Sequence, residues 1–341
     1  MILPPQTLER AWGRDHLRLH RHLRRQPELL PPGANLLLAV SGGQDSMALL
    51  ALLVGLRRLH GWQLQLWHGD HRWRSEAAQQ AAQLACWCRG QGLGLTIDAR
   101  DQPAAASSAH TEAQARAWRY ERLEAQALDQ GCSHVVCGHT ANDRAETLLL
   151  HLARGSHRRG LASLRPRRAL GSSGLQLSRP LLIFDRSDTG RICQQLQLPV
   201  WLDPTNSDLR YSRNRLRQTV LPELETLHPG AARRLGATAE RLACEHDTQH
   251  EWLRVALQWL AADPDGLDRA RLTGLQRVNQ AAALELWLSS QLGSSITACQ
   301  LDGLLERLQQ GRPPGRWDLA AGWQLRWDRT RLVLVQPEPA D

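Results

Sequence analysis

A strand-like run followed by a glycine-rich turn constrains this 341-residue chain more than any other feature. Residues 36–40 are all apolar, which is typical of a short buried strand. The turn that follows consists of Ser41, Gly42, Gly43, Gln44, Asp45 and Ser46. Its glycines allow a sharp turn into residues 47–59, where apolar residues recur at helical spacing. Backbone N–H groups and hydroxyls then surround one point, which suits an anion and above all a phosphate group.

An acidic residue inside this turn predicts a cation. A carboxylate repels a phosphate unless a cation lies between them, so Asp45 predicts a Mg²⁺ ion shared with a phosphate. The turn lacks the G-x-x-x-x-G-K-[ST] pattern of a Walker A loop. It resembles the loop of enzymes that split ATP into AMP and pyrophosphate while adenylating a substrate. The alternative is an ordinary strand–turn–helix connection capped by Ser41 or Asp45.

The composition describes a basic globular protein without lysine. All 42 basic residues are arginine, and the formal net charge is +8, which favours a polyanionic partner. The absence of lysine excludes mechanisms that need an internal one, such as a pyridoxal phosphate Schiff base or a lysyl-adenylate. No apolar run is long enough to span a membrane, and the N-terminus lacks a signal-peptide pattern. The seven cysteines form no C-x-x-C pair, so we expect a reduced, cytoplasmic setting and no structural zinc.

Strand-like and helix-like segments alternate about four times in the first half of the chain. We expect strands at 36–40, 63–67, 93–97 and 133–137, with helices between and after them. This alternation predicts an α/β fold with a doubly wound, mainly parallel sheet and ligands at the carboxyl ends of its strands. The segments 41–46, 68–71 and 138–143 each follow a strand, so they should meet at one edge of the sheet.

Changes in sequence character predict three parts: a basic helical segment at 1–33, an ATP-binding domain at 34–230, and a mostly helical region at 231–341. In the last part we expect helices at 231–260, 267–292 and 297–309, followed by a β-hairpin formed by 323–327 and 331–335.

A histidine and two acids follow the fourth strand. His139, Asp143 and Glu146 are spaced by four and three residues, which places them on neighbouring faces of a helix start. Asp143 is a candidate for holding a metal or orienting a nucleophile, and His139 for binding phosphate or transferring protons near pH 7. A helix cap or a surface acid is the alternative for Asp143. His68 and His71 lack a third nearby ligand, so we expect polar contacts from them and no zinc site.

Two basic clusters follow. The first holds six arginines and no acid: Arg154, Arg158, Arg159, Arg165, Arg167 and Arg168. It predicts contact with RNA or polyphosphate, with a salt-dependence slope of roughly −0.7 to −0.9 per phosphate; a solvated loop is the alternative. Arg213, Arg215 and Arg217 form the second cluster.

Seven motifs follow one another between residues 34 and 230: SGGQDS, HGDHRWRSEA, Glu112-x-x-x-Arg116-x-x-Arg119-Tyr120, GHTANDRAETLLLHLARG, RPLL, DPTN and SRNRLRQTVLPEL. They stand in the order found in tRNA(Ile)-lysidine synthetases, a family of PP-loop ATP pyrophosphatases. The chain resembles this family throughout that range. One departure is His157, which stands where the family often has a glycine.

The resemblance implies an enzyme that uses ATP to adenylate the C2 oxygen of the wobble cytidine in the CAU anticodon of tRNA(Ile). Free L-lysine then displaces AMP and gives lysidine. It implies that residues 41–46 bind ATP, that Asp45 also holds Mg²⁺, and that Asp45, His139 and Asp143 are catalytic. Contacts to substrate or tRNA are implied for Arg116, Arg119, Arg154, Arg158, Arg159 and Arg213. The region 231–341 is expected to contact tRNA as well, and a homodimer is left open.

Two other functions stay open at this point. A related tRNA thiolase would need reactive cysteines, and Cys132 and Cys137 are the only candidates near the expected site. Cys137 falls within an expected buried strand, which favours a packing role. A non-catalytic RNA-binding protein would not need the intact turn at 41–46 or Asp143.

Overall fold

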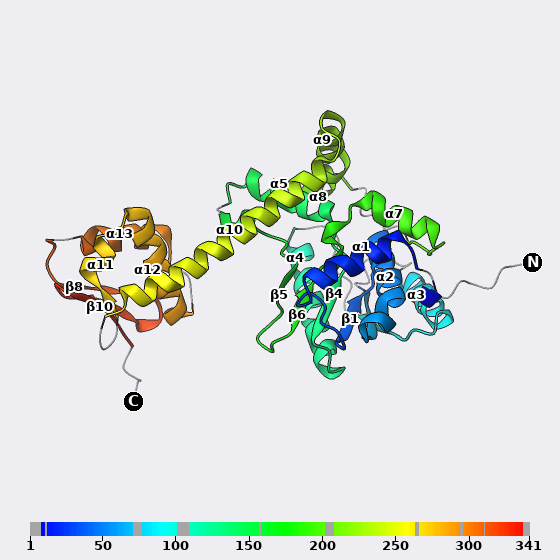
Figure 1. The fold of residues 1–341 in the computed structure, drawn as a ribbon, viewed down its shortest axis with the longest axis horizontal. Coiled ribbons are helices and arrows are strands. Elements are labelled where there is room, and N and C mark those ends of the chain that lie inside the picture. The colour runs from blue at the N-terminus through cyan, green and yellow to red at the C-terminus, as the bar shows by residue number, and fades with distance from the viewer. Residues whose placement is uncertain are drawn as a thin grey trace, which may run out of the picture. The chain divides into compact units, whose positions relative to one another are not determined.

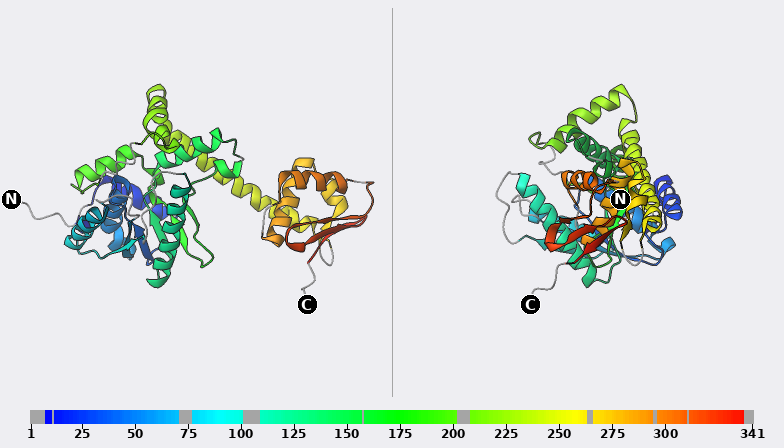
Figure 2. Two further views of the ribbon diagram at one scale, coloured as in Figure 1. Left: turned by 180° about the vertical axis from the view of Figure 1, so that it is seen from behind. Right: turned by 90° about the vertical axis from the view of Figure 1, so that its left-hand side faces the viewer.

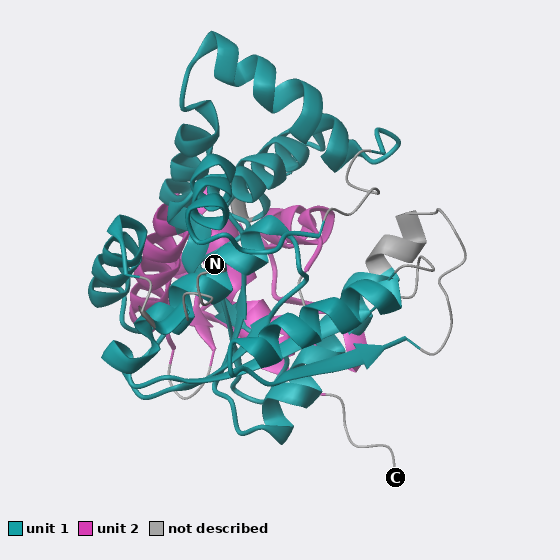
Figure 3. Ribbon diagram, turned by 90° about the vertical axis from the view of Figure 1, so that its right-hand side faces the viewer, with its two compact units in different colours: residues 1–243 teal, residues 244–341 magenta. Residues whose placement is uncertain are grey.

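The computed structural model describes residues 8–10, 12–70, 77–100, 109–156, 158–201, 208–262, 266–293, 296–309 and 311–336. The chain divides into two compact units, residues 1–243 and 244–341 (Figure 3). The division falls inside the long helix α10 (Ala231–Leu260), beyond the loop at 229–230. Each unit has its own apolar core. In the described part of the chain, no helix is both long and apolar enough to cross a membrane.

A six-stranded sheet forms the centre of the first unit (Figure 1). Its strands, in the order in which they pair, are β3 (Leu95–Ala99), β2 (Gln63–Asp70), β1 (Asn35–Ala39), β4 (His134–Cys137), β6 (Gln176–Ser178) and β5 (Arg167–Ala169). All neighbours are parallel except β5, which runs antiparallel to β6. The predicted mainly parallel, doubly wound sheet is therefore confirmed.

Helices cover both faces of this sheet (Figures 1 and 2). Their bounds are α1 (Arg14–Arg25), α2 (Gln44–His60), α3 (Ala77–Gly90), α4 (Ala109–Asp129), α5 (Ala141–Ala153) and α7 (Arg186–Gln195). Successive residues of β1 point to opposite faces: Leu36 and Leu38 pack in the core formed with α1, α2, α3 and α7, whereas Leu37 packs with α4. Helix α2 is buried from Ser46 to Val54, because apolar residues occupy nearly its whole surface.

Strand β2 is longer than predicted. The strand predicted at 63–67 continues through residues 68–70, which pair in parallel with residues 97–99 of β3 and extend it to Asp70. His71 and the rest of the motif that follows lie outside the described residues.

Short helices complete the first unit. They are η1 (Leu8–Arg10), α6 (Arg158–Leu161), η2 (Pro180–Ile183), α8 (Ser212–Arg215), the π-helical turn η4 (Leu216–Val220) and α9 (Leu221–Leu227). A π-helical turn is rare and is often found at functional sites. Here it joins α8 to α9 and carries Arg217.

The second unit combines helices with a four-stranded antiparallel sheet. Its elements are β7 (Leu267–Asp268), α11 (Arg269–Thr273), α12 (Arg277–Leu292), α13 (Ala298–Leu308), β8 (Gly315–Asp318), η5 (Ala320–Gly322), β9 (Gln324–Trp327) and β10 (Arg331–Val335). The expected hairpin is confirmed as β9 and β10. The prediction of a single helix at 267–292 is wrong, because Leu267 and Asp268 pair with β10 and α11 ends at Thr273, before α12 begins.

Candidate active site

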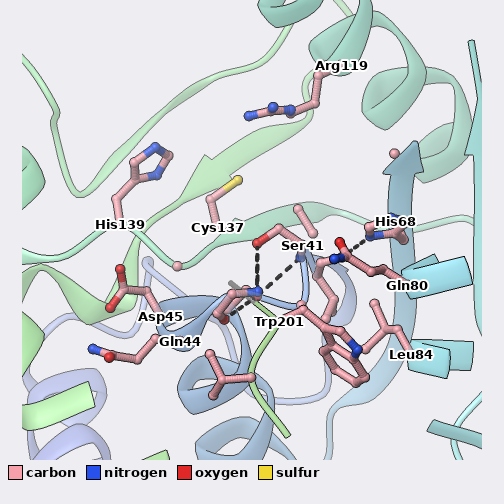
Figure 4. A pocket seen from close by; sticks show the side chains of 18 of the residues that line it. Ser41, Gln44, Asp45, His68, Gln80, Leu84, Arg119, Cys137, His139 and Trp201 are labelled. Atoms are coloured by element: carbon pink, nitrogen blue, oxygen red, sulfur yellow. Dashed lines mark hydrogen bonds between the residues drawn. The ribbon is translucent and has the colours of Figure 1, made fainter. Parts of the chain in front are cut away.

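The turn between β1 and α2 presents an uncapped helix N-terminus. Gly43 is the N-cap residue of α2, and no side chain caps the helix, so the alternative in which Ser41 or Asp45 is the cap is wrong. The Ser41 hydroxyl accepts a hydrogen bond from Gly43 N–H at 3.3 Å and lies 3.1 Å from the Ser46 hydroxyl (Figure 4). Backbone N–H groups at such a helix start, together with the helix dipole, favour an anion.

Glycine is required at two positions around this turn. Gly42 has φ of +82°, in the left-handed region, and a Cβ there would lie 3.1 Å from the Trp201 ring. A Cβ on Gly138, at the end of β4, would lie 2.9 Å from the carbonyl oxygen of Asp45. The β4–α5 turn therefore approaches the start of α2 closely because Gly138 has no side chain.

Asp45 is held by α7. Its Oδ1 accepts a hydrogen bond of 2.6 Å from the Thr189 hydroxyl, which in turn accepts one of 2.8 Å from Gln44 Nε2. Burial raises the pKa of Asp45, and the nearby Arg186 guanidinium opposes that rise. The carboxylate thus has one fixed orientation at the base of the site.

The three segments predicted to meet do so around one cavity of about 430 Å³. Residues 41–46, 68–70 and the Gly138–His139 turn all line it, together with Cys137, Asp143, Arg119, Arg186, Trp201 and Arg217. In Figure 4 the side chains of His139, Cys137 and Arg119 lie on one side of the pocket, and those of Asp45, Gln44 and Trp201 lie on the other. The prediction that strand ends bring these segments together is confirmed, and a volume of this size suits a small-molecule ligand.

His139 carries a neutral imidazole. Its Nδ1 is buried without a hydrogen-bond partner, and burial lowers its pKa to about 3, despite the opposing effect of Asp143. The expectation that His139 transfers protons near pH 7 therefore does not fit this environment, because the ring stays neutral there. A neutral imidazole still offers one hydrogen-bond donor and one acceptor to a ligand.

Asp143 and the fully buried Glu146 form an ion cluster with two arginines. Asp143 Oδ1 accepts hydrogen bonds from Arg213 at 3.1 Å and Arg217 at 3.3 Å, and Glu146 accepts from the same two at 2.8 and 2.7 Å. The Asp143 Oδ2 also accepts from the Thr140 N–H at 2.8 Å. Burial alone would raise the pKa of Asp143, but the Arg213 guanidinium, the hydrogen bond from the Thr140 N–H and the Arg217 guanidinium outweigh it and lower that pKa. The carboxylate is therefore ionised at neutral pH.

The remaining residues that the resemblance implies as contacts to substrate or tRNA lie in different places. Arg119 lines the cavity, Arg116 is exposed on α4, and Arg154 is exposed at the end of α5. His157, the side chains of Arg158 and Arg159, and the DPTN motif at 203–206 lie outside the described residues.

Cys137 is the last residue of β4, whereas Cys132 lies two residues before the first residue of that strand. The three strand steps from His134 to Cys137 alone span roughly 10 Å. Both are buried, and burial raises the pKa of each thiol. They cannot share a metal cluster or a disulfide in this fold.

Several residues of the site were not predicted from the sequence. Thr189, Trp201 and Arg186 contact it from regions without a recognised motif. Arg217 was predicted only as a member of the second basic cluster, although its position four residues after Arg213 is a spacing that puts both side chains on one helix face.

Known proteins resemble this chain in sequence. Residues 18–224 match the family model described as PP-loop domain. The tRNA(Ile)-lysidine synthase of Parasynechococcus marenigrum (strain WH8102) is 48% identical over 335 residues, covering 97% of this chain and 98% of that protein. A protein of the same description from Prochlorococcus marinus is 39% identical over 335 residues, covering 96% of this chain and 98% of that protein.

Among solved structures, the U34-tRNA thiolase NcsA from Methanococcus maripaludis superposes with a TM-score of 0.57. The alignment covers 71% of this chain and 84% of that chain at 15% sequence identity. At this level of identity the similarity concerns the fold alone.

Proposed function

The chain belongs to the tRNA(Ile)-lysidine synthase family of PP-loop proteins, and from this premise we propose how its own residues carry out the reaction. The activity is the ATP-dependent formation of lysidine on tRNA(Ile). One observation carries the assignment of the site: the uncapped start of α2, Asp45, His139 and Asp143 converge on a single cavity of about 430 Å³.

The chemistry requires two displacements. In the first, the C2 oxygen of the wobble cytidine attacks the α-phosphate of ATP, and pyrophosphate leaves. In the second, the neutral ε-amine of free L-lysine attacks C2, and AMP leaves with the oxygen. Adenylation is needed because a cytosine C2 oxygen is otherwise a poor leaving group.

Ser41, Gly42, Gly43, Gln44, Asp45 and Ser46 form the ATP phosphate site in this proposal. The backbone N–H groups at the start of α2 and the Ser41 hydroxyl face the negative charge that grows on pyrophosphate as it leaves. With no lysine in the chain, the cationic side chains that line the cavity are those of Arg119, Arg186 and Arg217.

The donor set also fits a magnesium ion. The described residues contain no group of three or more His, Cys, Asp or Glu side chains arranged to hold a metal. Mg²⁺ typically binds one or two carboxylates and takes its other ligands from phosphates and water, so the single oriented carboxylate of Asp45 suits it. When bound, the ion would neutralise charge on the phosphates.

We assign orienting roles to His139 and Asp143. The neutral imidazole of His139 can donate a hydrogen bond to an oxygen at the α-phosphate without carrying charge. Asp143, with its charge balanced by Arg213 and Arg217, holds the far wall of the cavity in place. Arg116, Arg119, Arg154, Arg158, Arg159 and Arg213 are proposed contacts to tRNA or substrate. In Arg213 that role competes with its ion pairs to Asp143 and Glu146.

For the whole protein we propose a cytoplasmic enzyme, in line with its seven free cysteines. Residues 244–341 contain more acidic residues than arginines, so the positive charge of the chain resides in the first unit. A tRNA contact by the second unit would therefore rely on shape and hydrogen bonding more than on net charge. A homodimer is kept as a proposal to be checked by analytical ultracentrifugation.

Nucleoside mass spectrometry tests the function. Purified protein would be incubated with ATP, Mg²⁺, L-lysine and an unmodified CAU-anticodon tRNA(Ile), with matched reactions lacking ATP or lysine. We expect one cytidine to gain the mass of lysine minus water, with AMP released. AMP release that depends on a sulfur donor would support thiolation, and tRNA binding without any product would support a non-catalytic RNA-binding protein.

A further inference from the structure

Four arginine side chains surround the carboxyl end of β4. Arg116 and Arg119 come from α4, Arg168 from β5, and Arg179 from the residue after β6. All four are close enough to Cys137 for their charges to act on its thiol. Arg116 and Arg179 also act on His139, so this cluster borders the proposed reaction centre.

Tyr120 organises two of these arginines. The guanidinium carbons of Arg116 and Arg168 lie 5.0 and 5.1 Å from the centre of the Tyr120 ring. Both distances are within the range of a cation–π contact. A tyrosine ring attracts cations but carries no net charge, so it brings the two arginines together without neutralising them.

Arg179 donates a hydrogen bond to the Tyr120 hydroxyl and is almost fully buried, with 2% of its surface exposed. Its Nη1 donates to the carbonyl oxygen of Arg165 at 2.7 Å, but its Nε is buried without a partner. In the part of the chain that the structure describes, no carboxylate forms an ion pair with Arg116, Arg168 or Arg179. A buried cation next to two further cations is costly unless an anion completes the group.

We propose that Arg116, Arg168 and Arg179, arranged around Tyr120, bind a backbone phosphate of the tRNA beside the wobble nucleotide. This inference rests on the proposed function only in taking tRNA as the source of the phosphate. Guanidinium groups match phosphate oxygens in geometry and charge. The site is distinct from the ATP phosphate site, because the residues that line the cavity at the start of α2 include Arg119 but not Arg116, Arg168 or Arg179. In this proposal Tyr120 is a positioning residue, because its ring holds two of the arginines that bind the phosphate.

The decisive comparison is between two neighbouring arginines. Arg167 and Arg168 are adjacent on β5, so their side chains point to opposite faces of the strand. Both are exposed, and the charge of Arg167 acts on His134, away from the cluster. Arg168→Gln and Arg167→Gln therefore remove the same charge from the same strand, on different faces.

Binding of unmodified CAU-anticodon tRNA(Ile) would be measured by fluorescence anisotropy at several salt concentrations without ATP. We expect Arg168→Gln to weaken binding about fivefold to tenfold and to reduce the magnitude of the salt slope by about 0.7–0.9, as for the loss of one phosphate contact. Arg167→Gln should keep a slope close to that of the unmodified protein. Equal losses and equal slopes in both variants would overturn the proposal, because they would indicate only general attraction to a basic surface.

Two variants of Tyr120 examine its positioning role. Tyr120→Phe keeps the ring that contacts Arg116 and Arg168 but loses the hydroxyl that accepts a hydrogen bond from Arg179, so its salt slope should lie between those of the unmodified protein and Tyr120→Leu. Tyr120→Leu should lose as much slope as Arg168→Gln. In the double variant that combines Tyr120→Leu with Arg168→Gln, the loss of salt slope should be no larger than in either single variant. Additive losses, or a Tyr120→Phe variant as weak as Tyr120→Leu, would contradict that role.

ATP binding in the absence of tRNA distinguishes the source of the phosphate. We expect Arg168→Gln to leave the ATP dissociation constant unchanged. A matching loss of ATP affinity would assign the cluster to a nucleotide phosphate and overturn the tRNA assignment. Because these readouts are binding constants, an absence of lysidine in the mass-spectrometric reaction would contradict the proposed function without altering the comparison of Arg168→Gln with Arg167→Gln.

Discussion

The Thr189 hydroxyl lies 2.6 Å from Oδ1 of Asp45, and this hydrogen bond links α7 to the start of α2. Thr189 is fully buried and also accepts a hydrogen bond from Gln44, so its hydroxyl has a fixed direction. The carboxylate proposed to hold Mg²⁺ is therefore oriented by a residue far away in the sequence.

Thr189→Val tests this orientation, since valine keeps the shape of threonine and lacks only the hydroxyl. We expect the Mg²⁺ concentration that gives half-maximal pyrophosphate release to rise about threefold to tenfold, because Asp45 loses its hydrogen bond. Thr189→Ser keeps a hydroxyl and should restore most of the affinity. Isothermal titration of Mg²⁺ into the protein with a non-hydrolysable ATP analogue gives a readout independent of turnover. Equal behaviour of the two variants would show that the hydroxyl is not needed.

Asp45→Asn separates chemistry from RNA binding. We expect pyrophosphate release to fall at least a hundredfold, because the amide cannot replace the carboxylate as a Mg²⁺ ligand. The affinity for tRNA should change little, since Asp45 lies at the ATP phosphate site. Filter binding with labelled tRNA checks the second part. A parallel loss of both properties would point to a role of Asp45 in folding.

The same residue gives a stability prediction. Burial raises the pKa of Asp45, so the folded state holds this proton more tightly than the unfolded chain does. Ionisation of Asp45 therefore costs stability at pH 7, and the cost disappears as the pH falls through the raised pKa. We expect Asp45→Asn to melt at the same temperature as the unmodified protein or higher at pH 7, with the difference shrinking in acid. A lower melting temperature at pH 7 would show that the Thr189 hydrogen bond outweighs burial.

Glu146→Gln should destabilise the first unit. Glu146 is fully buried and pairs with Arg213 and Arg217, whose side chains keep 32% and 22% exposure. Loss of the charge leaves two partly buried cations without their main partner, at a cost of about 1–3 kcal/mol in the free energy of unfolding, less than for a fully buried pair. Urea unfolding measures the change. Asp208→Asn removes an exposed ion pair with Arg210 and should leave the urea midpoint almost unchanged, because solvent screens such a pair.

His139 should not titrate between pH 5 and pH 8. Burial lowers its pKa to about 3, so its protonated form is absent throughout that range. Carbon–proton correlation spectra of ¹³C-histidine-labelled protein, assigned by comparison with His139→Gln, should show a constant shift for this ring. Free histidine added to the sample serves as the titrating reference. A shift that follows the reference would restore His139 as a candidate for proton transfer.

Local sequence was enough to predict the centre of the first unit. A run of apolar residues at 36–40 can form little but a buried strand, and the glycines at 42 and 43 allow the turn into α2. The alternation of strands and helices then implied a parallel sheet, and with it the meeting of residues 41–46 with the Gly138–His139 turn. These inferences held because each depends on periodicity within a short window.

The contacts between segments that are distant in the chain depend on the tertiary structure alone. The hydrogen bond from Thr189 to Asp45, the packing of Trp201 against Gly42 and the pairing of β7 with β10 join segments that are far apart in the chain. No local pattern records such contacts, because any threonine, tryptophan or short apolar pair has the same local preferences whether or not a partner is nearby. The sequence by itself therefore determined which residues could meet an anion at a strand end. The folded chain determined how Asp45 is oriented, that His139 is neutral and which arginines already have partners, since each of these depends on burial and on neighbours supplied by other elements.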